Sequence, residues 1–111
     1  MRVSDGFLAL LQDQLSDLGT VTARRMFSGA GVYIDGVIFA LVIDDVLYLK
    51  TDEQNRAQFD AKNLEHFTFV KAGKTIVTGY RAAPEEAFED RRVMAKWARS
   101  AYAAALRKAS R

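Results

Sequence analysis

The sequence contains no cysteine, one proline and one histidine among its 111 residues. The absence of cysteine excludes a disulfide scaffold, a cysteine-ligated zinc site and a thiol nucleophile. His66, the single histidine, has no second histidine or cysteine with which to share a metal or complete a catalytic triad. We therefore expect a protein that is not an enzyme and that has no catalytic residue, no metal site and no cofactor.

Long apolar runs are also lacking. The longest one, Val37 to Ile43, has the length of a strand and is far shorter than the roughly 20 residues that cross a bilayer. The N-terminus lacks the charged start and apolar middle of a signal peptide. We expect no membrane association and a cytoplasmic location. With 50% hydrophobic and 27% charged residues, the sequence predicts a single globular domain over residues 1–111. The net charge of +2 is too small to indicate a partner.

Apolar spacing and capping residues predict three helical regions. The first runs from Asp5 to Leu18, with Ser4 or Asp5 as its cap and Gly19 as its stop. The second runs from Thr51 to about Ala61, because Thr51 and Gln54 have the spacing of a capping box. The third follows Pro84, breaks near Asp90 and continues to about Leu106.

Strand signals fill the intervening segments. Asp35-Gly36, Asp44-Asp45 and Ala72-Gly73-Lys74 are turn sequences that separate short apolar runs. The predicted strands are Val32–Ile34, Val37–Ile43, Val46–Lys50, Phe67–Lys71 and Thr75–Tyr80. The order α-β-β-β-α-β-β-α predicts an α+β fold with two layers, a five-stranded antiparallel sheet and helices packed on it.

The glycine-rich segment Ser28-Gly29-Ala30-Gly31 has two interpretations. Its backbone N–H groups can cradle a phosphate, which makes a small-ligand binder one alternative. The segment lacks the Gly-Lys-Ser/Thr ending of a P-loop, and it precedes a strand rather than a helix. We favour the second interpretation, in which the glycines permit a β-bulge or a close crossing of the backbone.

The last helix carries a basic stripe. From Arg91 to Arg111 there are seven Lys or Arg and no Asp or Glu. Four of the cations gather on one side of the helix: Arg92, Lys96, Arg99 and Arg107. Such a stripe can neutralise phosphates, so a small nucleic-acid-associated regulator is another alternative, although cations also complement the helix C-terminus.

A second candidate surface is an apolar groove that binds a peptide. Its candidate residues are Tyr33, Tyr48, Tyr80 and Tyr102, with Phe39. Tyr102 and Leu106 fit either a homodimer contact or packing on the first helix.

Several separated segments resemble the N-terminal domain of the TfoX (Sxy) family of bacterial competence regulators. The resemblance covers about residues 7–105, with Ser28 at a position where the family usually has glycine. The matching segments are Met26-Phe27-Ser28-Gly29-Ala30-Gly31 with the hairpin up to Ala40, Leu47–Asp52, Asn55-Arg56, Phe59, the second hairpin, Tyr80–Glu86 and Trp97-Ala98. Within them, Met26, Phe27, Gly29 and Gly31 form the family-signature loop.

The resemblance implies a fold similar to that of type III secretion chaperones and a link to competence and transcription regulation. Because the chain ends at Arg111, we expect a stand-alone N-terminal domain without the C-terminal domain of full-length TfoX proteins. The favoured function is a non-enzymatic protein-interaction or regulatory domain that binds another protein or its own copy as a homodimer. A nucleic-acid regulator acting through the last helix and a ligand binder at Gly29 to Gly31 stay as alternatives.

Overall fold

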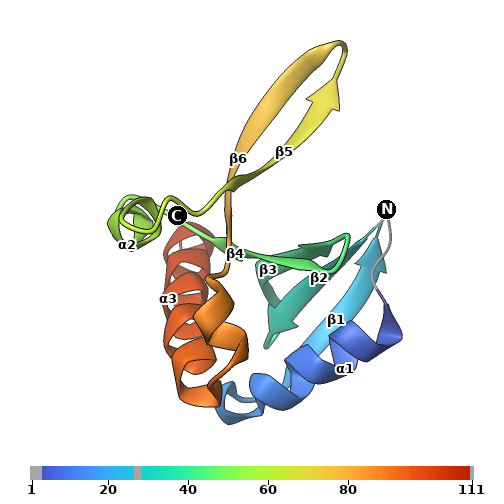
Figure 1. Ribbon diagram of the computed structural model, residues 1–111, viewed down its shortest axis with the longest axis vertical. Coiled ribbons are helices and arrows are strands. Elements are labelled where there is room, and N and C mark those ends of the chain that lie inside the picture. Colours follow the sequence, from blue (N-terminus) through green and yellow to red (C-terminus); the bar gives the residue numbers. More distant parts are fainter. Residues whose placement is uncertain (1–3, 27–28, 111) are drawn as a thin grey trace.

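The computed structural model describes residues 4–26 and 29–110. These residues form three α-helices and six strands in an α+β arrangement (Figure 1). The α-helices are α1 (Asp5–Gln14), α2 (Arg56–Asp60) and α3 (Arg91–Ala109), and two 3-10 helices are η1 (Ser16–Leu18) and η2 (Glu85–Phe88). The strands are β1 (Val21–Met26), β2 (Gly29–Ile34), β3 (Val37–Ile43), β4 (Val46–Lys50), β5 (His66–Lys71) and β6 (Lys74–Ala82).

The strands form one antiparallel sheet in the order β1-β2-β3-β4-β6-β5. The first four strands follow one another as a meander, and β6 pairs with both β4 and β5. Three hairpins close with two-residue turns in which both central residues have positive φ: Asp35-Gly36, Asp44-Asp45 and Ala72-Gly73. Positive φ at both positions matches the twist of the flanking strands, so the first two predicted turns are confirmed. The third is confirmed in position but is one residue shorter than predicted, because Lys74 belongs to β6.

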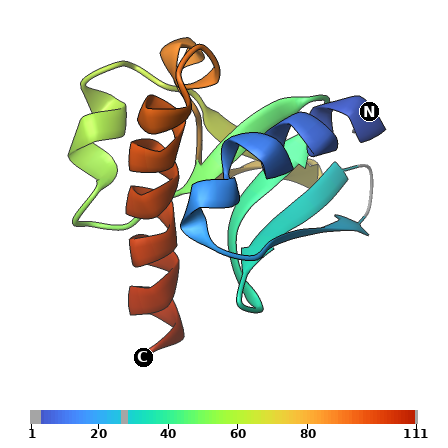
Figure 2. The ribbon, with the colours of Figure 1, turned by 90° about the horizontal axis from the view of Figure 1, so that it is seen from below.

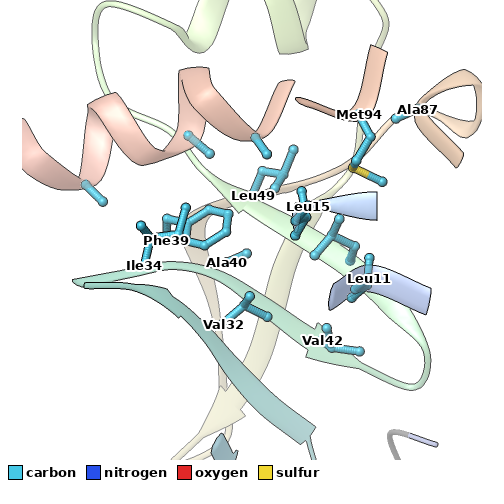
Figure 3. Packing of buried hydrophobic residues seen from close by; sticks show 14 of the residues in the cluster. Leu11, Leu15, Val32, Ile34, Phe39, Ala40, Val42, Leu49, Ala87 and Met94 are labelled. Atoms are coloured by element: carbon cyan, nitrogen blue, oxygen red, sulfur yellow. The ribbon is translucent and has the colours of Figure 1, made fainter. Parts of the chain in front are cut away.

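Helices α1 and α3 cover one face of the sheet and enclose the core (Figures 1 and 2). The core joins α1 through Leu11 and Leu15 to the inner faces of β2 and β3 (Figure 3). Small residues on α3 let the helix backbone lie close to the sheet: Ala95, Ala98, Ala101, Ala104 and Ala105 are all buried. Tyr102 packs edge-on against Phe39, with ring centroids 6.1 Å apart, whereas Leu106 is exposed.

The prediction of five strands was wrong, because the described residues form six. Strand β1 was missed, since Arg24 and Arg25 interrupt its apolar pattern. Its exposed residues are tolerated because β1 lies at the edge of the sheet and pairs only with β2. Strand β2 also begins at Gly29 rather than Val32, so the glycine segment is part of the sheet. The proposed similarity to type III secretion chaperones stays a prediction.

The second helix was also predicted too long. Helix α2 covers only Arg56–Asp60, and the predicted capping box of Thr51 and Gln54 does not form; Asp52 and Asn55 instead hold the turn before the helix. The Asp52 carboxylate accepts hydrogen bonds from the backbone N–H groups of Gln54 and Asn55, and the Asn55 side-chain oxygen accepts from the Asp52 N–H. The Thr51 hydroxyl donates instead to the Gly79 carbonyl oxygen in β6, at 2.5 Å.

The remaining helix boundaries agree largely with the predictions. Ser4 caps α1 by accepting from the Phe7 N–H, and Gly19 ends η1 with φ of 121°. The first helix is shorter than predicted, since α1 ends at Gln14 and continues only as η1. Asp90 separates η2 from α3 and caps α3 through the Arg92 N–H. Among the described helices, none combines the length and the apolar character needed to cross a bilayer.

Replacing Ala101 with leucine tests the close approach of α3 to the sheet. Ala101 has no exposed surface, so the larger side chain must displace core residues. We expect Ala101→Leu to lower the free energy of unfolding by about 1–3 kcal/mol. The matched control is Ala109→Leu, at an exposed position of the same helix. Urea unfolding followed by circular dichroism measures both, and equal stability of the two variants would contradict this account of the packing.

Candidate protein-binding site

Strand β5 and the outer half of β6 form a two-stranded ribbon that projects away from the rest of the molecule (Figure 1). Four large apolar side chains of this ribbon are exposed: Phe69 (42%), Val70 (71%), Ile76 (37%) and Val77 (61%). No helix covers either face of the ribbon in the described part of the chain (Figure 1). The ribbon therefore presents apolar surface that packing within the described residues leaves unburied.

One face of the ribbon continues onto the sheet as an aromatic row. Phe69 lies opposite Ile76, and the Phe67 and Phe69 rings are stacked with centroids 6.2 Å apart. The Phe67 ring in turn contacts Tyr48 of β4, at 5.3 Å. Because alternate residues of a strand share a face, the row extends from the ribbon along the side of the sheet opposite the helices.

The open side of the sheet is lined by half-buried apolar residues. In β3, Phe39, Ala40 and Val42 are buried, and Leu41 points to the open side by alternation. Gly31 lies opposite Leu41, and Leu41 lies opposite Tyr48, so these residues form a row across three strands. The predicted groove of tyrosines with Phe39 is not formed as one surface, because Phe39 is fully buried and packs against Tyr102 on the helix side, whereas Tyr48 lies on the open side.

Gly31 shapes this open side by its lack of a side chain. A Cβ atom at Gly31 would lie 2.8 Å from Met26 Cε, 2.9 Å from Ile38 Cδ1 and 3.1 Å from Tyr33 Cε1. The side chains of Met26, Ile38 and Tyr33 pack over Gly31 because this residue has no side chain to separate them. Two members of the family-signature loop, Met26 and Gly31, thus contribute to the open side, while Phe27 lies outside the described residues.

Gly29 allows the backbones of β2 and β3 to approach closely, as predicted. A Cβ atom there would clash with the carbonyl oxygen of Val42 and with the Ile43 side chain. Both Gly29 and Gly31 are buried in β2, and protein atoms fill the space beside their Cα atoms. The register shift of this strand pair lies beyond the glycines, between Val32 and Tyr33, where Phe39 of β3 is the extra residue.

A hollow of about 700 Å³ lies at the base of the ribbon. It has contributions from β4, the turn after β4, α2, the ribbon and the last turns of α3. Its lining residues are Lys50, Thr51, Asp52, Glu53, Arg56, His66, Val77, Thr78, Gly79, Ala104 and Lys108. His66 sits at the ribbon base as the first residue of β5, with Nδ1 2.9 Å from the Thr78 carbonyl oxygen. No cluster of three metal-ligating side chains occurs in the described ranges.

The charges in the hollow are mainly positive. Burial and the neighbouring Lys108 ammonium lower the pKa of Lys50, and the Lys50 Nζ lies 4.9 Å from the centre of the Tyr80 ring. Burial raises the pKa of Tyr80, and the nearby Tyr33 adds to that effect. Asp52 is already engaged, because Arg107 donates two hydrogen bonds to its carboxylate, at 2.5 and 2.8 Å.

The predicted basic stripe of the last helix is divided. Arg92, Lys96 and Arg99 are exposed, whereas Arg107 faces Asp52 and uses its guanidinium in that ion pair. A nucleic-acid contact by the first three residues stays a prediction.

Sequence reasoning missed the exposure of Phe69, Val70, Ile76 and Val77. The sequence did contain a signal. Each ribbon strand has consecutive apolar residues, which place apolar side chains on both faces of the ribbon, and such faces need to be packed against other parts of a protein.

Comparison with known proteins finds a matching family and a curated relative. The TfoX N-terminal domain family matches residues 13–105. Protein Sxy of Escherichia coli strain K12 is 29% identical over 100 residues, which cover 89% of this chain and 47% of that protein. The chain thus spans about half the length of this curated relative.

The pH dependence of stability tests the Asp52–Arg107 pair. The hydrogen bonds from Arg107 lower the pKa of Asp52 to about 2, from an ordinary value of 3.8. Stability from this ionised carboxylate is therefore present above the ordinary value and lost as the pH falls toward about 2. We expect Asp52→Asn to cost about 1–2 kcal/mol near neutral pH, with the difference from wild type shrinking in acid.

Urea unfolding at a series of pH values measures this difference. The matched control is Glu53→Gln, which removes the adjacent exposed carboxylate and leaves the ion pair intact. A deficit of Asp52→Asn that is the same at every pH would show that charge at Asp52 is not responsible.

Proposed function

This chain belongs to the TfoX N-terminal domain family, and we propose that it is a competence-regulator-like domain that acts by binding another protein. The role is regulatory and not enzymatic. The observation that carries the proposal is the apolar surface of the projecting ribbon, continued by the aromatic row on the open side of the sheet. The work of the domain takes place in the cytoplasm.

Exposed apolar surface of this kind supports protein binding. Isolated apolar residues on a surface are ordinary, but a contiguous patch that includes aromatic side chains is typical of a contact site. Phe67, Phe69 and Tyr48 offer large, rigid contact areas that lose little conformational entropy on binding. They are also the residue types that supply most of the binding energy in many interfaces.

The carboxyl groups with a lowered pKa take part in structural contacts. The described carboxyl groups whose pKa is lowered have partners that explain the change. A hydrogen bond from Lys62 lowers the pKa of Glu86, and the Arg92 backbone N–H lowers the pKa of Asp90. Arg107 does the same for Asp52. These groups stabilise helix ends and join segments, which leaves them engaged in structure.

Site-specific photocrosslinking in living cells tests the proposal. A photoreactive phenylalanine analogue at Phe69 keeps an aromatic ring on the exposed ribbon, and the same analogue at exposed Gln12 on α1 serves as the control. We expect a crosslink of defined mass to one protein from Phe69 and none from Gln12. The mass identifies a homodimer if the partner is a second copy of this chain.

Nucleic-acid binding through α3 is the competing outcome. The proposal predicts that Lys96→Glu with Arg99→Glu leaves the Phe69 crosslink unchanged, because both residues lie on the exposed side of α3. Electrophoretic mobility with mixed-sequence duplex DNA provides the comparison. Salt-dependent DNA binding that this double variant abolishes, together with no protein crosslink from Phe69, would reject the proposal.

A further inference from the structure

The chain leaves the sheet after β4 and exposes one edge of β6. Pairing of β4 with β6 ends at Lys50 opposite Tyr80. The last bond between the segments runs from the Thr51 N–H to the Gly79 carbonyl oxygen, at 2.9 Å. The backbone then turns away at Asp52 toward α2. Beyond that point β6 keeps β5 on one side, and within residues 4–26 and 29–110 no strand lies on the other.

Hydrogen-bond alternation identifies the backbone groups at this open edge. The Gly79 carbonyl and the Ala83 N–H both bond toward β4, whereas the Ala82 N–H bonds toward the β5 side through Glu65. The backbone N–H and C=O groups of the odd-numbered residues of β6 therefore point toward β4. By the same alternation the N–H and C=O groups of Thr75 and Val77 face the edge that β4 has left.

The cation-lined hollow lies along this edge. Val77, Thr78 and Gly79 of β6 form one side of it. Three cations, Lys50, Arg56 and Lys108, come from β4, α2 and α3, and His66 adds a fourth titratable nitrogen group. Of the two lining carboxylates, Asp52 is held by Arg107, which leaves Glu53. A strand placed in the position that β4 vacates would bring its side chains among these cations.

We propose that the free edge of β6 binds an extended, acidic peptide segment of a partner protein. The segment adds to the sheet in line with β4, and its backbone bonds to Thr75 and Val77. Its carboxylates meet Lys50, Arg56 and Lys108. The binding mode is strand addition, in which main-chain bonds supply affinity and side-chain contacts supply specificity. This inference rests on the proposed function and specifies where and what the domain binds.

Charge favours a foreign acidic segment over a second copy of this chain. The outer edges of the sheet are β1, which carries Arg24 and an Arg25 that is paired with Asp5, and β5, which carries His66 and Lys71. Neither strand contains Asp or Glu. Addition of either edge to β6 of another copy would place cations against the cations of the hollow, and like charges across an interface oppose association.

The test uses a blocked, fluorescein-labelled peptide in which glutamate alternates with threonine and valine. Fluorescence anisotropy at low salt measures its binding to the full chain. We expect saturable binding that weakens at least about tenfold when glutamine replaces glutamate, a change of about 1.4 kcal/mol. A peptide with a central proline, which cannot donate from its backbone, should also lose binding.

Variants of the protein locate the contact. We expect Arg56→Gln with Lys108→Gln to weaken binding about tenfold, and Lys96→Gln on the outer side of α3 to leave it unchanged. Hydrogen exchange followed by NMR should detect slower exchange of the Thr75 and Val77 amide protons when the peptide is bound. Unfolding curves establish that each variant is folded before its binding is compared.

Three results would overturn the inference: no binding at low salt, equal binding of the glutamate and glutamine peptides, or no protection at Thr75 and Val77. A concentration-dependent dimer that forms through the same β6 edge would replace the acidic segment with a second copy and also overturn it. The proposed function is judged separately, because a protein crosslink from Phe69 without acidic-peptide binding retains the function and rejects this site.

Discussion

The point where the chain leaves β4 determines the shape of the candidate binding surface. Thr51 makes the last bonds to β6, and Asp52 then redirects the backbone through its hydrogen bonds to Gln54 and Asn55. Arg107 holds the same carboxylate from the far end of α3, 55 residues away in the sequence. Because the backbone is held at this turn, β4 cannot extend alongside β6. The projecting ribbon and the hollow beneath it both follow from that limit.

The buried core supports this arrangement without reaching the ribbon. Helix α3 lies close to β3 and β4 because its inner side carries alanines, and Phe59 of α2 packs edge-on against Trp97, at 5.0 Å. Arg81, buried in β6, donates to Asp60 and to the Leu64 carbonyl and so joins α2 and the following loop to the sheet. These contacts stabilise the base of β6. Among the described residues, the outer half of β6 has β5 as its only neighbour in the sheet, which separates the packed part of the domain from the exposed ribbon.

The sequence was informative where local chemistry decides the structure. Asp35-Gly36 and Asp44-Asp45 form the predicted turns, and Ser4 caps α1, because each effect acts over a few residues. The edge strand β1 was not predictable from apolar alternation, since pairing with β2 stabilises it despite Arg24 and Arg25. The site was less predictable still. The hollow brings together residues from Lys50 to Lys108, and tertiary packing alone sets that convergence.

The ribbon itself gives a physical reason for binding by strand addition. An isolated pair of strands is marginally stable in water, whereas three strands with a packed apolar face support one another. In this chain the Phe67 and Phe69 rings stack along one face of the ribbon, but Val70 and Val77 on the other face remain largely exposed. A third strand at the free edge of β6 would pair the open backbone groups and shelter Val77 beside the hollow. If a partner binds there as proposed, recognition is coupled to ordering of the ribbon, because the contacts that select the partner would also stabilise the ribbon.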